Sequence, residues 1–238
     1  MPKGKSAREI GQSTRGMGRP TTTVLTRPLI AEAALKLLDA SGAEGFTMSR
    51  LAKALGVRPS ALYKHFRGKE EVIAGVRELV SDRIDVSAFA TQPWQIALHA
   101  WAQSYRVAFA KHPPTIALLA TMPITGAHRT LAMYDIVVAA MVRAGWPEHE
   151  VLPVIVAVES FVLGSALDAV APPDMLDPSG TESAVPAFAS AYWARDAALG
   201  TASPADAAFA LGLRALMIGL QDLFDELTGS GGSESAGS

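Results

Sequence analysis

Apolar residues recur every three or four positions along most of this chain, which is the period of one face of an α-helix. Ile30, Ala34, Leu37 and Leu38 show this spacing near the start. Glycine and proline interrupt the pattern where helices would end, and no stretch alternates convincingly as a strand would. The fold is therefore predicted to be all-α, with helices over residues 28–41, 47–55, 59–66, 69–84, 94–110, 114–120, 127–144, 147–171, 183–199 and 204–227.

Charged residues divide the 238-residue chain into a basic front and an acidic rear. Residues 1–69 hold 13 Lys and Arg against 4 Asp and Glu, a net charge of +9, whereas residues 70–238 hold 8 against 19, a net charge of −11. A basic front favours contact with nucleic acid, although a solubilising tail is the simpler alternative. We expect a disordered basic arm over 1–26, a folded helical part over 27–228 and a disordered Gly/Ser-rich tail over 229–238.

Several kinds of site and location are excluded by what the sequence lacks. It has no cysteine, which rules out disulfides, thiolate nucleophiles and cysteine-based metal sites. Its five histidines form no short metal-binding spacing. The apolar runs 136–142 and 151–158 are too short to span a bilayer, and the first 26 residues lack the apolar stretch of a secretory leader. We therefore expect a cytoplasmic protein that needs no metal or cofactor and contacts no membrane.

Residues 47–66, TMSRLAKALGVRPSALYKHF, have the pattern of a helix-turn-helix. Gly56 permits a sharp turn between two short helices, and Val57 can fill the angle between them. A short second helix with a polar outer face fits the major groove of B-DNA. Small side chains allow close approach, and hydroxyl or basic groups can bind phosphates and bases. The candidate DNA contacts are Thr47, Arg58, Ser60, Ala61, Tyr63, Lys64, His65 and Lys69.

A purely structural interpretation of the same segment stays open at this point. Tyr63 and Phe66 can be core residues, and Lys64, Arg67 and Lys69 can form a solvated face. We expect Phe66 to be core and the candidate contacts to face DNA, because the front of the chain is strongly basic.

Residues 28–75 resemble the N-terminal domain of TetR-family transcriptional regulators. The similarity runs through IAEAALKLLDASGAEGFTMSRLAKALGVRPSALYKHFRGKEEVI, including the Gly-Val turn and the Leu-Tyr-x-His-Phe recognition helix. The resemblance implies a repressor that binds a palindromic double-stranded DNA operator as a homodimer, with the fourth helix relaying ligand binding to the heads. It also implies that the eight candidate residues are DNA contacts. Ala61 and Pro59 depart from a base-reading pattern, so we expect base contacts from Lys64, Arg58 and the arm.

The rear of the chain resembles, more loosely, the C-terminal domain of the tetracycline-repressor subgroup. Shared landmarks include Trp94 and the segments 121–123 (TMP) and 161–164 (FVLG). Together the two resemblances imply a helix-turn-helix DNA-binding domain over 27–72 and a helical ligand-binding and dimerisation domain over 73–228. The second resemblance implies a small-molecule inducer pocket and a four-helix dimer interface, built here from 147–171 and 204–227 of each copy. The side chains at the pocket positions suit an apolar or aromatic molecule. The candidate ligand-binding residues are Trp101, Tyr105, Met122, Tyr134, Glu159, Phe161 and Asp168.

The pattern with which that subgroup binds tetracycline and magnesium is absent. Its magnesium-ligating histidine falls at Leu118 or Leu119 here, and an asparagine that holds the drug is replaced by Trp101. For each candidate pocket residue, a place in the ordinary core is the alternative.

The sequence thus favours a ligand-responsive, dimeric repressor that is not an enzyme. A non-specific DNA-binding protein and an activator remain alternatives. A third is an enzyme with a fused DNA-binding head that uses Glu159 or Asp168 as acid or base. The sequence shows no catalytic motif or dyad spacing that supports it.

Overall fold

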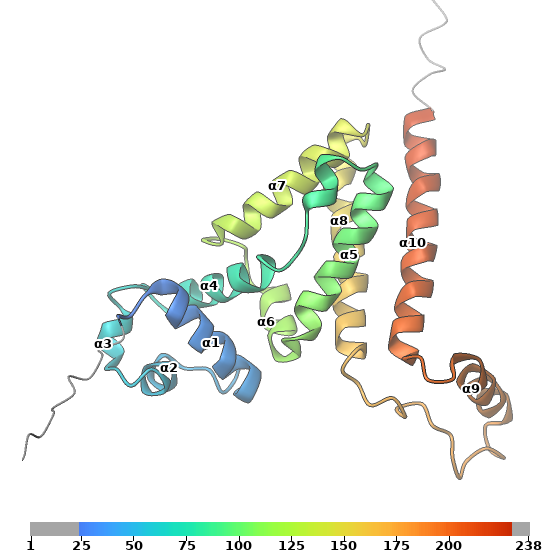
Figure 1. Cartoon of the computed structure of the whole chain (residues 1–238), viewed down its shortest axis with the longest axis horizontal. Helices are drawn as coiled ribbons and strands as arrows, with labels where there is room; N and C mark the ends of the chain where they lie inside the picture. The colour runs from blue at the N-terminus through green and yellow to red at the C-terminus, as the bar shows by residue number, and fades with distance from the viewer. Residues whose placement is uncertain (1–23, 230–238) are drawn as a thin grey trace, which may run out of the picture.

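All regular structure is helical in the part of the chain that the computed structural model describes, residues 24–229 (Figure 1). This confirms the all-α prediction. The expected arm and tail lie outside the described residues, apart from residues 24–26 and Gly229. The α-helices are α1 (Arg27–Ser41), α2 (Met48–Ala54), α3 (Pro59–Leu62), α4 (Lys69–Ser81), α5 (Trp94–Ala110), α6 (Ile116–Thr121), α7 (His128–Arg143), α8 (Glu148–Asp168), α9 (Pro186–Leu199) and α10 (Pro204–Gly229), and the 3-10 helices are η1 (Ser87–Ala90) and η2 (Pro113–Thr115).

Helices α1, α2 and α3 form a small head around one apolar centre. Thr26 and Thr47 begin α1 and α2, because their hydroxyl oxygens accept hydrogen bonds from the backbone N–H of Leu29 and Arg50 at 3.3 and 3.2 Å. Burial of apolar side chains from all three helices and from the start of α4 holds them together. The buried side chains include Ile30, Leu38, Phe46, Leu51, Leu62, Phe66 and Val72.

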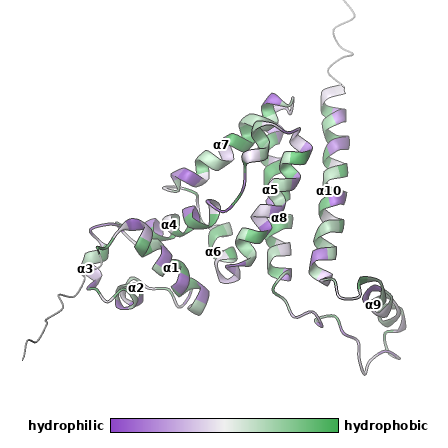
Figure 2. Ribbon diagram, viewed as in Figure 1, coloured by the Kyte–Doolittle hydropathy of each residue, from purple (hydrophilic) through white to green (hydrophobic). Residues whose placement is uncertain are grey.

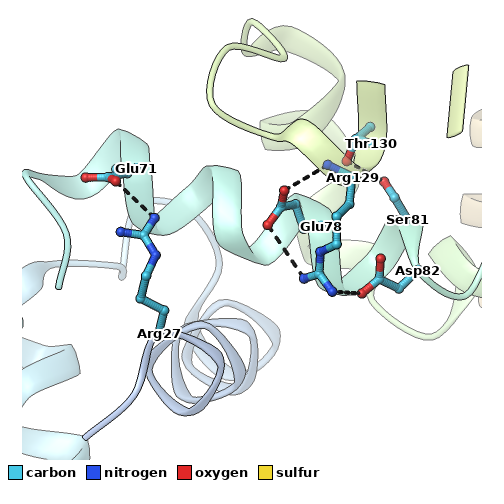
Figure 3. A network of polar contacts seen from close by, with 7 residues as sticks. All are labelled: Arg27, Glu71, Glu78, Ser81, Asp82, Arg129 and Thr130. Carbon is cyan, nitrogen blue, oxygen red and sulfur yellow. Dashed lines mark hydrogen bonds and ion pairs between the residues drawn. The ribbon is translucent and has the colours of Figure 1, made fainter. Parts of the chain in front are cut away.

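Helix α4 joins the head to the rest of the molecule and carries acidic residues along one side (Figure 3). Near its start, Glu71 binds the guanidinium of Arg27 on α1 at 2.9 Å. Further along, Glu78 and Asp82 bind Arg129 on α7 at 3.6 and 2.5 Å. These ion pairs fasten α4 to the head at one end and to the helical body at the other.

Helix α10 runs antiparallel to α5, and contacts at its two ends hold it there (Figure 1). Trp94 at the start of α5 meets Phe224 near the end of α10, with ring centroids 5.5 Å apart. At the opposite end, Arg106 of α5 binds Asp206 of α10 at 2.6 Å. The apolar faces of α5 and α8 (Figure 2) meet in the body's core, which is filled by Leu98, Trp101, Ala102, Val137, Met141, Val151, Ile155, Val158 and Val162.

Several helices end earlier than the sequence predicts. Helix α3 ends at Leu62, because the N–H groups of His65 and Phe66 both donate to the Leu62 carbonyl in a turn that precedes Gly68. Helices α4 and α8 each end three residues before the predicted ends at 84 and 171. Helix η1 was not predicted, since four residues are too few to show a period.

By length and composition alone, α8 and α10 could each cross a membrane. The expectation that no segment is long enough was based on uninterrupted apolar runs, and the averaged hydropathy of these helices corrects it. A core helix of a soluble protein meets the same criterion, and α8 contributes Val158 and Val162 to the core. Both helices also leave large apolar side chains exposed, among them Leu152, Val156, Leu211 and Ile218.

Candidate functional site

The turn between α2 and α3 fixes the helix that is predicted to enter the major groove. Gly56 has a φ of 66°, a left-handed conformation that glycine adopts without strain. The N–H of Val57 then donates to the Ala52 carbonyl at 3.0 Å. Leu62 and Phe66 are buried in the head, so α3 is anchored from its inner side.

The candidate DNA contacts lie on α3, in the turns next to it and at the starts of α2 and α4, and they are mostly exposed. Thr47, Arg58, Ser60, Tyr63, Lys64 and Lys69 are exposed, and Ala61 and His65 are partly exposed. Tyr63 leaves 54 % of its surface in solvent, whereas Phe66 leaves 2 %. Phe66 is therefore core, as expected, and Tyr63 is a surface residue.

The cations of this surface are not neutralised within the head. Among residues 24–229, Arg58, Lys64 and Lys69 have no carboxylate within 4.0 Å. Lys69 instead lies 5.5 Å from the ring centre of Phe46, in cation–π contact. Free cations around an exposed helix end are suited to phosphate.

Four of the seven candidate ligand-binding residues line one cavity of about 250 Å³, which we call the tyrosine cavity: Tyr105, Met122, Tyr134 and Glu159. The Tyr134 hydroxyl donates to the Glu159 carboxylate. Tyr105 stacks on Phe109 with centroids 4.9 Å apart. The remaining lining is largely apolar and comes from α6, α8 and the segment after α6, with Leu119, Ala120, Ile124, Val156, Ser160 and Leu163.

The other three candidates lie elsewhere. Trp101 is fully buried behind Tyr105, with ring centroids 5.1 Å apart, and is not part of the cavity lining. Phe161 stacks on Phe209 of α10 at 5.6 Å. Together with the exposed Asp168 it lines a separate groove between α8 and α10. In the described part of the chain, no three His, Asp or Glu side chains are grouped to hold a metal ion.

Arg77 of α4 also lines the tyrosine cavity, and sequence analysis missed it. It lies in the buried stripe of α4, between Ile73 and Val80 at helical spacing. An arginine within an apolar stripe was the signal that could have identified it, because a buried charge needs a partner.

Burial shapes the electrostatics of the tyrosine cavity. It raises the pKa of Glu159 above the usual range, although hydrogen bonds from Tyr134 and Tyr105 and the charge of Arg77 oppose that shift. It also raises the pKa values of Tyr105 and Tyr134, so both stay protonated. The pKa of Arg77 is lowered, again chiefly by burial. An arginine remains charged even so, which makes Arg77 the fixed charge of this cavity.

A larger cleft of about 640 Å³ lies beside α4, and we call it the α4 cleft. It is bounded by Arg27 at the start of α1, by the turn 67–68 before α4, and by the segment 122–128 between α6 and α7. Arg77 and Met122 line both this cleft and the tyrosine cavity. The two spaces are therefore neighbours that share one wall.

Comparison with known proteins agrees with this architecture. A model of "Bacterial regulatory proteins, tetR family" matches residues 30–76, and one of the "Tetracyclin repressor-like, C-terminal domain" matches residues 90–224. An HTH-type transcriptional regulator of Saccharopolyspora erythraea is 31% identical over 186 residues, which is 78% of each chain. Tetracycline repressor protein class E of Escherichia coli is 26% identical over 196 residues, 81% of this chain and 89% of the repressor.

A solved structure shows the same fold. The Streptomyces coelicolor TetR family protein ActR, in complex with actinorhodin, aligns with a TM-score of 0.65 at 22% identity over 83% of this chain and 97% of ActR. At that identity the similarity concerns the fold alone. The two family models and the S. erythraea relative go further, and they establish that this chain belongs to the TetR family of bacterial transcriptional regulators.

Proposed function

We propose that this protein is a transcriptional repressor that binds a palindromic operator as a homodimer and is released by a small-molecule inducer. The observation that carries the proposal is the course of α4. It begins at the candidate DNA contact Lys69 and continues to Arg77 in the wall of the tyrosine cavity. A molecule in the cavity thus touches the same helix that supports the DNA-binding surface.

Operator binding would place α3 in the major groove. Tyr63, Lys64 and Arg58 are exposed on or beside α3, and Lys64 and Arg58 have no carboxylate partner within 4.0 Å inside the described chain. Two heads related by a dimer axis would enter successive major grooves, about one helical turn apart. Such a protein acts where the DNA is, in the cytoplasm.

The inducer would bind in the tyrosine cavity. Its lining combines the rings of Tyr105, Tyr134 and Phe109 with a few polar groups, which suits an aromatic molecule with hydrogen-bonding substituents. ActR was solved in complex with actinorhodin, which supports a small-molecule site in this fold. An inducer that binds more tightly to an arrangement of the heads that does not fit the operator shifts the population away from the DNA-binding state.

Dimerisation would cover the exposed apolar side chains of α8 and α10. Leu152 and Val156 on α8 and Leu211 and Ile218 on α10 are each more than half exposed. Exposed apolar patches of this kind mark interfaces, and two helices from each copy would form a four-helix contact. Contact with a second copy accounts for the exposure of these apolar side chains. Insertion into a membrane would also cover them, but it would place the charged head near the bilayer. Binding to lipid vesicles by a protein that is monomeric in solution would contradict this assignment.

The proposed DNA contacts are tested by fluorescence anisotropy. The DNA is a labelled fragment that the protein has selected from a random pool. Tyr63→Ala and Lys64→Ala are each expected to weaken binding by about tenfold or more. Lys111→Ala is the matched control, because Lys111 is an exposed lysine of the body outside the proposed contacts. Unchanged affinity in both head variants would exclude α3 as the recognition helix. Equal affinity for unrelated sequences would favour the non-specific alternative.

A further inference from the structure

Two arginines of the body are equally buried but differ in their partners. Arg106 on α5 and Arg77 on α4 are each 9 % exposed. Arg106 binds the carboxylate of Asp206 at 2.6 Å. Among the described residues, Arg77 has no carboxylate within 4.0 Å, and its one hydrogen bond runs from Nη2 to the Met122 carbonyl at 2.7 Å. A buried cation without an ion pair is costly, and the charge of Glu159 offsets only part of the desolvation of Arg77.

The remaining donors of Arg77 are available to a ligand. Nε and Nη1 make no hydrogen bond within residues 24–229, and neither is among the buried atoms that lack a partner. Both atoms therefore keep some accessible surface, and the side chain lines the tyrosine cavity and the α4 cleft. Nη2 donates one N–H to Met122 and keeps a second. That N–H, paired with the N–H of either Nε or Nη1, forms a planar fork that matches the two oxygens of a carboxylate.

We propose that the molecule bound in the tyrosine cavity is an aromatic acid, whose carboxylate or similarly acidic oxygen binds Arg77. This inference deepens the proposed function and rests on the assignment of the tyrosine cavity as the inducer site. The aromatic part lies among Tyr105, Tyr134 and Phe109, and a hydrogen-bond donor on it reaches Glu159. An amine in the same place would meet the fixed positive charge of Arg77 and is disfavoured.

The electrostatics of the cavity support an acid over an amine. Glu159 is the one carboxyl in the cavity lining, and within the described chain it makes no ion pair with Arg77. Its carboxylate instead accepts a hydrogen bond from Tyr134, and burial raises its pKa. The guanidinium of Arg77 is charged over the whole working pH range, so it is the group that a ligand anion would bind. The adjoining α4 cleft gives the ligand space to extend past Arg77, and its lining contains Arg67 and His128 as well as the carboxylates of Glu70 and Glu71. The acidic group is therefore placed at Arg77 and not further along the cleft.

Isothermal titration calorimetry with three matched probes tests the inference on the full chain. The probes are 2-naphthoate, 2-naphthalenemethanol and 2-naphthylmethylamine, which share one ring system and differ in charge. We expect the acid to bind about tenfold more tightly than the alcohol or the amine. Arg77→Met is expected to abolish this preference, and Arg77→Lys to retain part of it. Arg129→Met is the matched control and should keep the full preference, since Arg129 also binds α4 but lines neither space.

Each other result contradicts the inference. It is wrong if the alcohol or the amine binds as tightly as the acid, or if the acid shows no binding up to about 1 mM. It is also wrong if Arg77→Met keeps the preference for the acid while a cooperative thermal transition shows that this variant is folded. If Arg77→Met does not fold, Arg77→Lys decides: a preference for the acid that is smaller than in the unmodified protein supports the proposal, and an unchanged preference or one reversed towards the amine refutes it.

Release of the selected DNA fragment, measured in parallel, separates this inference from the proposed function. Release by the acid and the alcohol alike would support induction and refute the preference for an acid. Tight binding of the acid without DNA release would support the preference and refute ligand-controlled repression.

Discussion

Arg77 of α4 donates a hydrogen bond of 2.7 Å to the backbone carbonyl of Met122, the residue that follows α6. The bond ties the helix that supports the DNA-binding head to the wall of the tyrosine cavity. Arg129 adds a second tie between α4 and α7 through Glu78 and Asp82 (Figure 3). Ligand contacts at Arg77 would therefore act directly on the attachment of α4 to the body.

Tyr63 and Phe66 are expected to respond in opposite ways to truncation. Phe66→Ala empties a fully packed position, so it should lower the free energy of unfolding by about 3–5 kcal/mol. Tyr63→Ala removes an exposed ring and should change that free energy by no more than about 0.5 kcal/mol, while weakening DNA binding. Urea denaturation measures the free energy of unfolding of both variants, and fluorescence anisotropy measures their DNA binding. A large loss of stability in Tyr63→Ala would assign Tyr63 to the core.

The affinity for DNA should fall as salt concentration rises, because the unpaired cations of the head bind phosphates. For the selected fragment, the logarithm of the association constant is expected to fall linearly with the logarithm of salt concentration. Lys64→Ala should make this slope shallower by about one, because one phosphate contact is lost. Lys111→Ala should leave it unchanged. A flat response in the unmodified protein would show that the basic front does not bind phosphate.

Glu159→Gln should stabilise the protein at high pH but not at low pH. Burial raises the pKa of the Glu159 carboxyl in the native protein, so the charged carboxylate destabilises the native state relative to the unfolded chain. This destabilisation is fully present at pH values above the raised pKa. Below the ordinary pKa of glutamate the carboxyl is protonated in both folded and unfolded chains, so the cost disappears. We expect the Tm of the variant to exceed that of the unmodified protein by a few degrees at pH 8, with the difference shrinking towards pH 4.

Differential scanning calorimetry at both pH values tests this expectation. Asp168→Asn is a suitable control, because Asp168 is an exposed carboxylate on the same helix. A Tm difference for Glu159→Gln that is the same at both pH values would contradict the proposed electrostatics.

The proposed dimer predicts a position-dependent effect of charge on α10. Ile218→Asp puts a carboxylate into the expected contact, and we expect it to weaken self-association by at least about a hundredfold. Leu131→Asp is the control, since Leu131 is similarly exposed but lies on α7. Light scattering after size-exclusion chromatography measures the mass of each. If Leu131→Asp dissociates the dimer and Ile218→Asp does not, the interface does not lie on α10.

Much of the fold follows from local sequence signals, because helices depend on spacing and caps within one segment. Thr47 and Gly56 identify the start of α2 and the turn between α2 and α3. The exposure of Tyr63 and the burial of Phe66 also follow from the helix-turn-helix pattern.

Contacts between distant segments were less predictable. The resemblance to the tetracycline-repressor subgroup placed Phe161 with Glu159 in the pocket. Two residues along a helix turn the side chain to another face, however, and there Phe161 meets Phe209. Arg77 was missed because its hydrogen bond to Met122 joins residues 45 positions apart. The apolar period of α4 indicates that Arg77 is buried, but a local period encodes neither its contact with Met122 nor that of Phe161 with Phe209.

The attachment of α10 at its two ends has a consequence for folding. Only 17% of its most apolar window is buried within one copy, so a single chain gains little by ordering this helix. If the second copy supplies the missing burial, ordering of α10 and association are one event. The midpoint of thermal unfolding should then rise with protein concentration, as it does for proteins whose native state forms by mass action.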